Sequence, residues 1–202
     1  MSTTLTFSFQ HRALVPFAHD YAHGDSEPWH QHDCAQLLHI LSGVVRVDTP
    51  VGYWVVPPGR GVWLPAGTPH ALRVTGQVAA RTLFIDPLAR ADLPSSCQIV
   101  QITPLLRELI VTSLALAERY QPGSRDERIY ELILDEIRGM AVLPFGLLEP
   151  RSEALRRLCH KVREMPGQAW SSQQAAKESN MSERTLNRHF QQQTTLTWSE
   201  WV

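Results

Sequence analysis

The apolar positions divide the chain into two parts with different periods. Between residues 35 and 86, short apolar runs are separated by turn residues such as Ser42-Gly43, Pro57-Pro58-Gly59 and Gly76. Several short runs with regular turn signals are typical of an antiparallel sandwich or barrel. Proline cannot donate a hydrogen bond to a central strand, so Pro57 and Pro58 are expected in a connection. The pattern therefore predicts an antiparallel β barrel in the first part of the chain.

Beyond residue 87 the apolar positions recur at helical spacing. The pattern predicts helices over 103–120, 124–140 and 152–164. The second helix begins with Ser124 and Glu127 at the spacing of a capping box. The apolar faces of the first two helices fit packing against the barrel, and they equally fit a shared dimer face. Both interpretations stay open, and the fold class is predicted as α+β.

Composition favours a soluble, cytoplasmic protein. The chain has 202 residues, of which 43% are hydrophobic, enough for one or two globular cores. No apolar stretch reaches the roughly 18 residues of a membrane span, and the first ten residues do not resemble a secretion signal. The three cysteines are odd in number and far apart. This spacing indicates neither a disulfide framework nor a zinc knuckle, and three reduced thiols are expected.

Charge is spread unevenly along the chain. The formal net charge is -1, but residues 151–202 hold 8 Lys and Arg against 5 Asp and Glu, a surplus of +3. Residues 1–150 hold 11 against 15, which gives -4. A basic C-terminal part indicates a polyanionic partner, although a surplus of three charges is also common on an ordinary solvated face.

Histidines mark the predicted barrel as the place of a candidate site. His30 and His32 lie two residues apart, so a strand would direct both to the face that Gln36 also shares. His39 has the opposite parity and is expected to point away. Convergent imidazoles suit a metal ion, an anionic ligand or a plain polar rim. The side chains expected around the pocket are Trp29, His30, His32, Gln36, Trp63 and His70.

These residues resemble the two motifs of the cupin barrels. The first motif is represented by His30, His32 and Gly43, and the second by "GRGVWLPAGTPH", which ends at His70. In cupins, three such histidines and a glutamate of the first motif hold one metal. Here Gln36 stands at the carboxylate position, and a neutral amide is a much poorer ligand. Three imidazoles still suffice for zinc, nickel or iron, and a metal-free pocket for a small molecule is the alternative.

The C-terminal segment "SSQQAAKESNMSERTLNRHFQQQ" predicts a helix-turn-helix. Ser171 and Gln174 have capping-box spacing for a first helix, and Asn180 stands where the turn needs a left-handed residue. Ser182 is expected to cap the second helix, which buries Leu186 and Phe190. The outer face of that helix would present residues suited to contacting base edges and phosphates, namely Ser182, Arg184, Asn187, Arg188 and Gln191.

The pattern from Ala176 to Phe190 resembles the first helix-turn-helix of the AraC-type transcription regulators. Members of that family often join an N-terminal cupin effector domain to a C-terminal pair of such motifs, and the order here is the same. The resemblance implies that Arg184, Asn187 and Arg188 face the major groove. In the family a second helix-turn-helix follows, whereas this sequence stops at Val202, so we expect a chain truncated after the first motif, with weakened binding to promoter DNA.

The sequence is interpreted as a ligand-sensing transcription regulator rather than an enzyme. Three regions are predicted: a sensor barrel over 1–90, a helical coupling or dimerisation region over 91–149, and half of a DNA-binding domain over 150–202. The implied partners are promoter DNA, a small-molecule effector and a second copy of the chain. Two alternatives stay open: a metal-dependent cupin enzyme of the isomerase or oxygenase type, and a truncated sensor that titrates a full-length partner.

Overall fold

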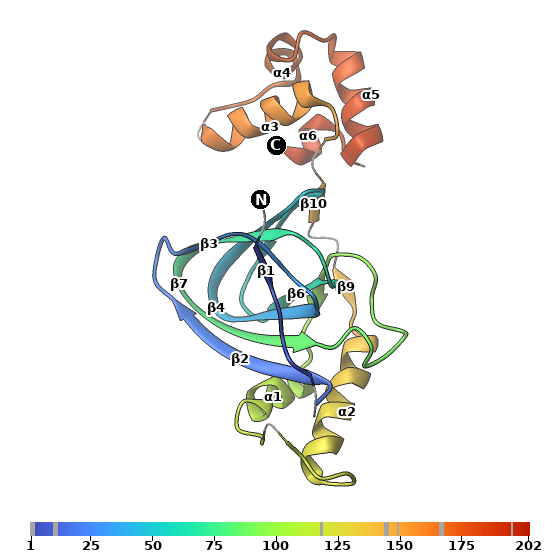
Figure 1. The fold of residues 1–202 in the computed structure, drawn as a ribbon. Helices are drawn as coiled ribbons and strands as arrows, with labels where there is room; N and C mark the ends of the chain where they lie inside the picture. Colours follow the sequence, from blue (N-terminus) through green and yellow to red (C-terminus); the bar gives the residue numbers. More distant parts are fainter. Residues whose placement is uncertain are drawn as a thin grey trace. The chain divides into compact units, whose positions relative to one another are not determined.

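The computed structural model describes residues 3–9, 12–117, 119–143, 146–148, 150–165, 168–194 and 196–202. The chain forms two compact units, Met1–Pro50 with Trp54–Gly146, and Val51–Tyr53 with Leu147–Val202 (Figure 1). The first is called the barrel unit and the second the helical unit. Residues 91–146, predicted as a region of their own, belong to the barrel unit. In the part of the chain that the structure describes, no helix is long and apolar enough to cross a membrane.

The barrel unit is built from antiparallel strands, as the turn pattern predicted. At its centre β7 (His70–Ile85) pairs with β2 (Leu14–Tyr21), β3 (Ser26–His32) and β4 (Ala35–Thr49). β4 continues the sheet through β6 (Arg60–Leu64), β8 (Gln98–Gln101) and β9 (Val142–Leu143). β1 (Thr3–Leu5) runs parallel to β3. The remaining strands are β5 (Gly52–Val56) and β10 (Gly146–Leu148).

Two predicted breaks are not breaks in the structure. β4 runs through Ser42-Gly43, and β7 runs through Gly76, so each forms one long strand. At Gly43 the pairing of β4 with β7 shifts register, and the glycine has φ 77°. A β-bulge of this kind bends a strand without ending it, and a glycine supplies the positive φ. Turn residues therefore marked a bend where we had predicted separate strands.

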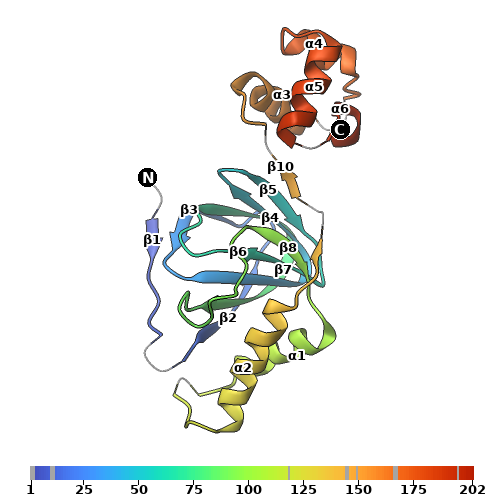
Figure 2. The same cartoon turned by 90° about the vertical axis from the view of Figure 1, so that its right-hand side faces the viewer.

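Two apolar clusters fill the barrel unit. One includes Leu38, Val62 and Leu72 and contains only strand residues and neighbours of the strands. The other combines the opposite side chains of the same strands, such as Leu37, with residues of α1 (Pro104–Ser113) and α2 (Arg125–Arg138). The two helices thus pack on the barrel, as Figure 2 shows. Packing within the chain explains their buried faces, and the homodimer stays a prediction.

The first predicted helix is shorter than its apolar pattern suggested. α1 ends at Ser113, whose hydroxyl donates to the carbonyl of Ile110 at 2.7 Å. The following amides of Leu114 and Leu116 bond three residues back, which is a tighter winding than the α-helix. The second helix agrees with the prediction, and its Ser124 hydroxyl accepts from the Glu127 amide.

The helical unit contains α3 (Glu153–Glu164), α4 (Ser172–Glu178), α5 (Glu183–Thr194) and α6 (Trp198–Trp201). Its core combines aliphatic residues of α3 and α5 with three tryptophans, Trp170, Trp198 and Trp201. Phe190 meets Trp198 edge-on, with ring centroids 5.3 Å apart. Small Ala175 and Ala176 are buried on α4, which lets α4 approach its neighbours closely. This core holds α4 and α5 in place.

Candidate functional sites

The barrel brings its three motif histidines together. His30 and His32 lie on β3, and His70 begins β7, directly opposite His30 in the strand pairing. All three side chains are buried. One ring nitrogen from each lies within 4.8 Å of the other two, so all three lie within about 2.8 Å of a common centre. A zinc–imidazole bond is about 2.0–2.1 Å long, so small rotations of the rings would reach that length.

Hydrogen bonds orient two of the rings. Nδ1 of His30 donates to the carbonyl of Pro28 at 2.7 Å, and Nδ1 of His70 donates to that of Thr68 at 2.8 Å. A ring that donates from Nδ1 keeps its Nε2 lone pair free for a ligand. Neither nitrogen of His32 nor the Oε1 atom of Gln36 has a partner with ordinary hydrogen-bond geometry among the described residues, although the Gln36 side chain lies near enough to His32 to oppose slightly the lowering of its pKa. Buried polar atoms without partners indicate a place where a bound ligand could supply the missing partners.

Two of the three imidazoles, those of His32 and His70, are uncharged at neutral pH. Burial lowers the pKa of His32 to about 4, and the neighbouring imidazoles of His70 and His30 act in the same direction. Burial also lowers the pKa of His70 to about 4. Only the neutral imidazole has a lone pair for a metal ion. These two rings are therefore in the protonation state that metal binding requires.

Aromatic side chains cover the cluster on one side. The ring of His32 lies edge-on to Phe84, with centroids 4.9 Å apart, and Phe7 stacks on Phe84. Gln36 is opposite Phe84 in the pairing of β4 with β7, which places it on the same side of the sheet. Cys34 is buried, and burial raises its thiol pKa to about 12. It does not belong to the group of convergent ligand atoms in the described chain.

Of the two predicted tryptophans, Trp63 does not line this site, whereas Trp29 lines a hollow next to Glu27. Trp63 is fully buried in the cluster shared with α1 and α2, and its Nε1 donates to the carbonyl of Pro94 at 2.8 Å. Trp29 is 46% exposed. Both were predicted as pocket walls, and the structure contradicts this for Trp63 because its parity on β6 is that of the helix-covered face. His39 also lies away from the cluster, but it is buried, with Nδ1 on the carbonyl of Arg60.

Sequence reasoning missed one acidic residue beside the cluster. The Oε2 atom of Glu27 lies 3.5 Å from Nε2 of His30, and the Oε1 atom accepts a hydrogen bond from the Tyr21 hydroxyl at 2.5 Å. Burial, followed by the bond to Glu27, raises the pKa of Tyr21, so its hydroxyl stays protonated and donates. The signal in the sequence was Pro28, because proline within a strand favours an irregular, bulged backbone.

The helical unit contains the predicted helix-turn-helix. Ser171 and Gln174 form a complete capping box at the start of α4. Asn180 has φ 55° in the turn, the left-handed conformation expected of it. The Ser182 hydroxyl accepts from the Thr185 amide at 3.2 Å and so caps α5. Leu186 and Phe190 are buried, as predicted.

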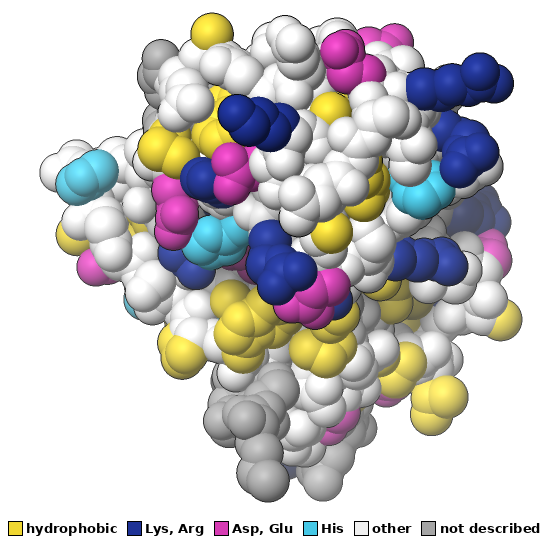
Figure 3. Space-filling model, turned by 90° about the horizontal axis from the view of Figure 1, so that it is seen from above, with side chains coloured by type: hydrophobic (Ala, Val, Ile, Leu, Met, Phe, Trp, Pro, Cys, Tyr) yellow, Lys and Arg dark blue, Asp and Glu magenta, His cyan; other side chains and the backbone are white. Residues whose placement is uncertain are grey.

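The outer face of α5 is partly as predicted. Arg184, Arg188 and Gln191 are exposed. Figure 3 shows several Lys and Arg side chains at the surface of the molecule seen from above. Asn187 differs from the prediction. Its Oδ1 accepts from the Trp198 amide at 3.3 Å, and its Nδ2 donates to the carbonyl of Glu183 at 3.1 Å. Both ends of this amide serve the fold, so Asn187 is a poor candidate for contacting bases.

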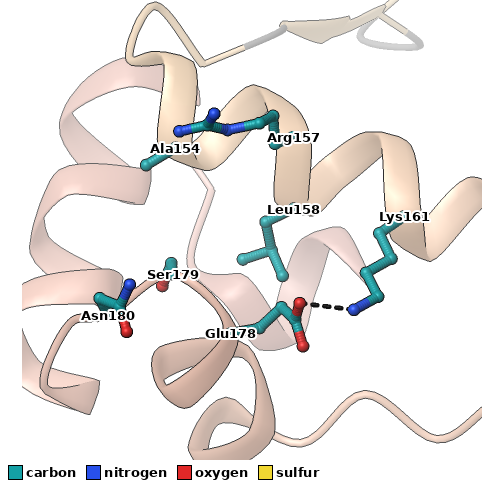
Figure 4. Close-up of a pocket in the computed structure, with 7 residues that line it drawn as sticks. All are labelled: Ala154, Arg157, Leu158, Lys161, Glu178, Ser179 and Asn180. Atoms are coloured by element: carbon teal, nitrogen blue, oxygen red, sulfur yellow. Dashed lines mark hydrogen bonds and ion pairs between the residues drawn. The ribbon is translucent and has the colours of Figure 1, made fainter.

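A polar hollow of about 320 Å³ opens between α3 and the end of α4 (Figure 4). Lys161 crosses it to bond Glu178, and the exposed Arg157 lies on its rim. Among the described residues, none of its side chains carries a buried polar atom without a partner. The hollow therefore offers exposed positive charge rather than an enclosed ligand site.

Comparisons with known proteins relate the chain to a known family. Residues 16–133 match the family described as AraC-like ligand binding domain. The chain is 30% identical over 194 residues to the HTH-type transcriptional regulator NimR of Escherichia coli (strain K12). The aligned region covers 95% of this chain and 70% of that protein. Among solved structures, ToxT from Vibrio cholerae is similar over 94% of this chain and 79% of its own, with 8% identity and TM-score 0.43. A cupin superfamily protein from Desulfitobacterium hafniense DCB-2 covers 40% of this chain and 84% of its own, with 14% identity and TM-score 0.34.

Proposed function

This chain belongs to the family of AraC-type transcription regulators, and from that premise we propose that it binds promoter DNA through α5 and responds to a small molecule in the barrel. The observation that supports DNA binding is the division of α5 into two faces. Leu186 and Phe190 attach one face to the unit's core, while Arg184 and Arg188 leave the other face positive and exposed. A helix that is held by one face can place its other face in a major groove of DNA while the core of its unit stays folded.

Arg188 is proposed to read a base. A guanidinium donates two parallel hydrogen bonds to O6 and N7 of guanine, which discriminates against the wrong base by about 1–3 kcal/mol. That energy corresponds to roughly 5- to 150-fold in affinity. Among the described contacts, the guanidinium of Arg188 meets only its neighbour His189, at 3.4 Å. It can therefore turn toward DNA without breaking an ion pair.

Selection from a pool of random duplexes tests this proposal. The 202-residue chain is expected to enrich a sequence with one conserved guanine, and Arg188→Ala should lose preference at that position by roughly 5- to 150-fold. Arg125→Ala is the matched control, because it removes an equal charge from an exposed position on α2 in the barrel unit. No enrichment by the wild-type chain would contradict specific DNA binding. An unchanged motif with Arg188→Ala would remove Arg188 from base recognition.

For the barrel we propose that His30, His32 and His70 hold one divalent ion, zinc, nickel or iron, as part of the effector site. The buried nitrogens of His32 and His70 that have no hydrogen-bond partner among the described residues, and the neutral state of these two rings, support this assignment. When bound, the ion would supply a Lewis-acidic centre with an open position for an electron-pair donor. Titration with Zn²⁺ is expected to saturate at one ion per chain, and His70→Gln should weaken this binding. A wild-type chain that takes up no ion would leave a metal-free pocket for an organic effector.

A further inference from the structure

We infer that Glu27 is the carboxylate ligand of the barrel site, in place of the acid that Gln36 does not provide, and that Tyr21 positions it. This inference rests on the proposed metal binding by the three histidines. Three neutral imidazoles leave the full double charge of an ion in a buried cluster. A carboxylate would neutralise half of that charge, and it is a good ligand for zinc or iron.

A β-bulge places Glu27 on the side of the histidines. In a regular strand, residues 27 and 30 would face opposite sides. Here Glu27 pairs with Leu72 and His30 pairs with His70, and the register shifts between these two pairs. On β7, Leu72 and His70 are two residues apart and therefore share a face of the sheet. Leu72 belongs to the apolar cluster that also contains Leu38 and Val62. The bulge therefore returns Glu27 to the face on which His30 and His70 lie.

Glu27 does not belong to the group of convergent ligand atoms that the three histidines form, so its side chain would have to move toward their common centre to bind a shared ion. Its approach to the His30 ring favours such a movement. Glu27 approaches Nε2, the nitrogen that is free to bind a metal, while Nδ1 is occupied by the carbonyl of Pro28. A carboxylate that merely oriented the ring would bond the nitrogen away from the metal. Two ligands at about 2.1 Å from a tetrahedral ion lie about 3.4 Å apart. The separation between Oε2 and Nε2 is 3.5 Å.

The other oxygen of Glu27 is held in place, and the group is accessible. Tyr21 reaches from β2 and donates to Oε1, which leaves Oε2 directed at His30. No Lys or Arg forms an ion pair with Glu27 among the described residues, so its charge is not already compensated by a fixed cation. Glu27 also lines a hollow of about 400 Å³ between residues 24–29 and 71–74, so its side chain is next to solvent.

Metal affinity of matched variants tests the inference. Zn²⁺ dissociation constants are measured by competition with a chromophoric chelator on the whole chain, after each metal-free variant has been shown to melt like the wild type. Loss of an outer-shell partner typically weakens binding 10- to 100-fold. We therefore expect about 10-fold for Tyr21→Phe and at least about 100-fold for Glu27→Gln, which keeps the size and an acceptor for Tyr21. Asp20→Asn is the control, since Asp20 precedes Tyr21 on β2 but is mostly exposed and paired with Arg81.

A second readout reports the ligand set directly. Co²⁺ in the site should show visible absorption bands that shift in Glu27→Gln and stay unchanged in Asp20→Asn. Glu27→Asp, which keeps the charge on a shorter side chain, should recover part of the Zn²⁺ affinity. If Glu27→Gln binds Zn²⁺ as tightly as the wild type while His70→Gln does not, the inference fails and the three-histidine site stands. If the wild-type chain binds neither ion, both fail.

Discussion

Gly43 is the position where one methyl group should reveal how tightly β4 and β7 approach each other. A Cβ atom built on Gly43 would lie 2.3 Å from the carbonyl oxygen of Gln77 and 2.5 Å from a methyl of Val78. Gly76 has nearly the same backbone, φ 79° against 77°, but nothing lies within 4 Å of its Cβ position. The two glycines therefore separate backbone strain from steric overlap.

Alanine at either position has the cost of a left-handed backbone, about 1–2 kcal/mol. At Gly43 the overlap adds the cost of overpacking, typically about 1–3 kcal/mol, because a backbone oxygen is among the atoms that must move. Gly43→Ala should thus be less stable than Gly76→Ala by about 1–3 kcal/mol. For a unit of this size the difference corresponds to a melting temperature roughly 3–9 °C lower.

Thermal and urea unfolding of the two variants, with the wild type as reference, measure this difference. Equal losses of stability at the two positions would show that the Gln77 segment moves away without cost. That result would refute the argument that the bulge in β4 requires glycine for close approach. A larger loss of stability in Gly76→Ala than in Gly43→Ala would also refute the assumption that the two positions share the same backbone strain.

Two further predictions concern protons and the fold of the helical unit. The folded-state pKa of His32 and of His70 is about 4, below the ordinary value of about 6.5. Protonation of either ring therefore favours the unfolded chain. The free energy of unfolding should be highest above pH 6.5 and fall as the pH decreases toward 4, by about 2 kcal/mol per ring at pH 5. Urea unfolding with EDTA at pH 7.5 and 5 measures this, and a His32→Gln chain with the same pH dependence would contradict it. Asn187→Ala should destabilise the helical unit by about 1–2 kcal/mol through the lost bonds to Glu183 and Trp198, without altering the selected DNA motif. If Asn187→Ala selected a different DNA motif and were as stable as the wild type, Asn187 would be a base-contacting residue.

The sequence predicted the parts of the fold that depend on local chemistry. Ser171 with Gln174 and Ser124 with Glu127 cap helices as expected, because a hydroxyl three residues before an amide is decided within one turn. The left-handed Asn180 follows from the same local rule. The convergence of the three histidines was also predictable, because strand parity directs His30 and His32 to one face and the resemblance to the cupin motifs implied that His70 joins them.

Predictions failed where the outcome depended on distant partners. Both faces of β6 are apolar, so parity could not decide whether Trp63 faced the interior of the barrel or the helices. Asn187 is on the outer face of its helix by periodicity, yet the α6 residue Trp198 takes up its amide oxygen. Glu27 was missed because strand parity was not extended across the bulge at Pro28. A bulge reverses every parity beyond it, and its position depends on the partner strand.

The histidine cluster is costly unless something binds to it. Four buried polar atoms, two of His32 and one each of Gln36 and His70, have no hydrogen-bond partner among the described residues. Each such atom costs about 1–3 kcal/mol when it is left unsatisfied. A ligand that binds only the folded barrel stabilises it by RT ln(1 + L/Kd), where L is the free ligand concentration. Such a gain becomes a signal only if the ligand binds two arrangements of the chain with different affinity. The sensing proposal therefore requires that the geometry of this cluster differ between two arrangements of the chain, because a ligand shifts their balance only by its differential affinity.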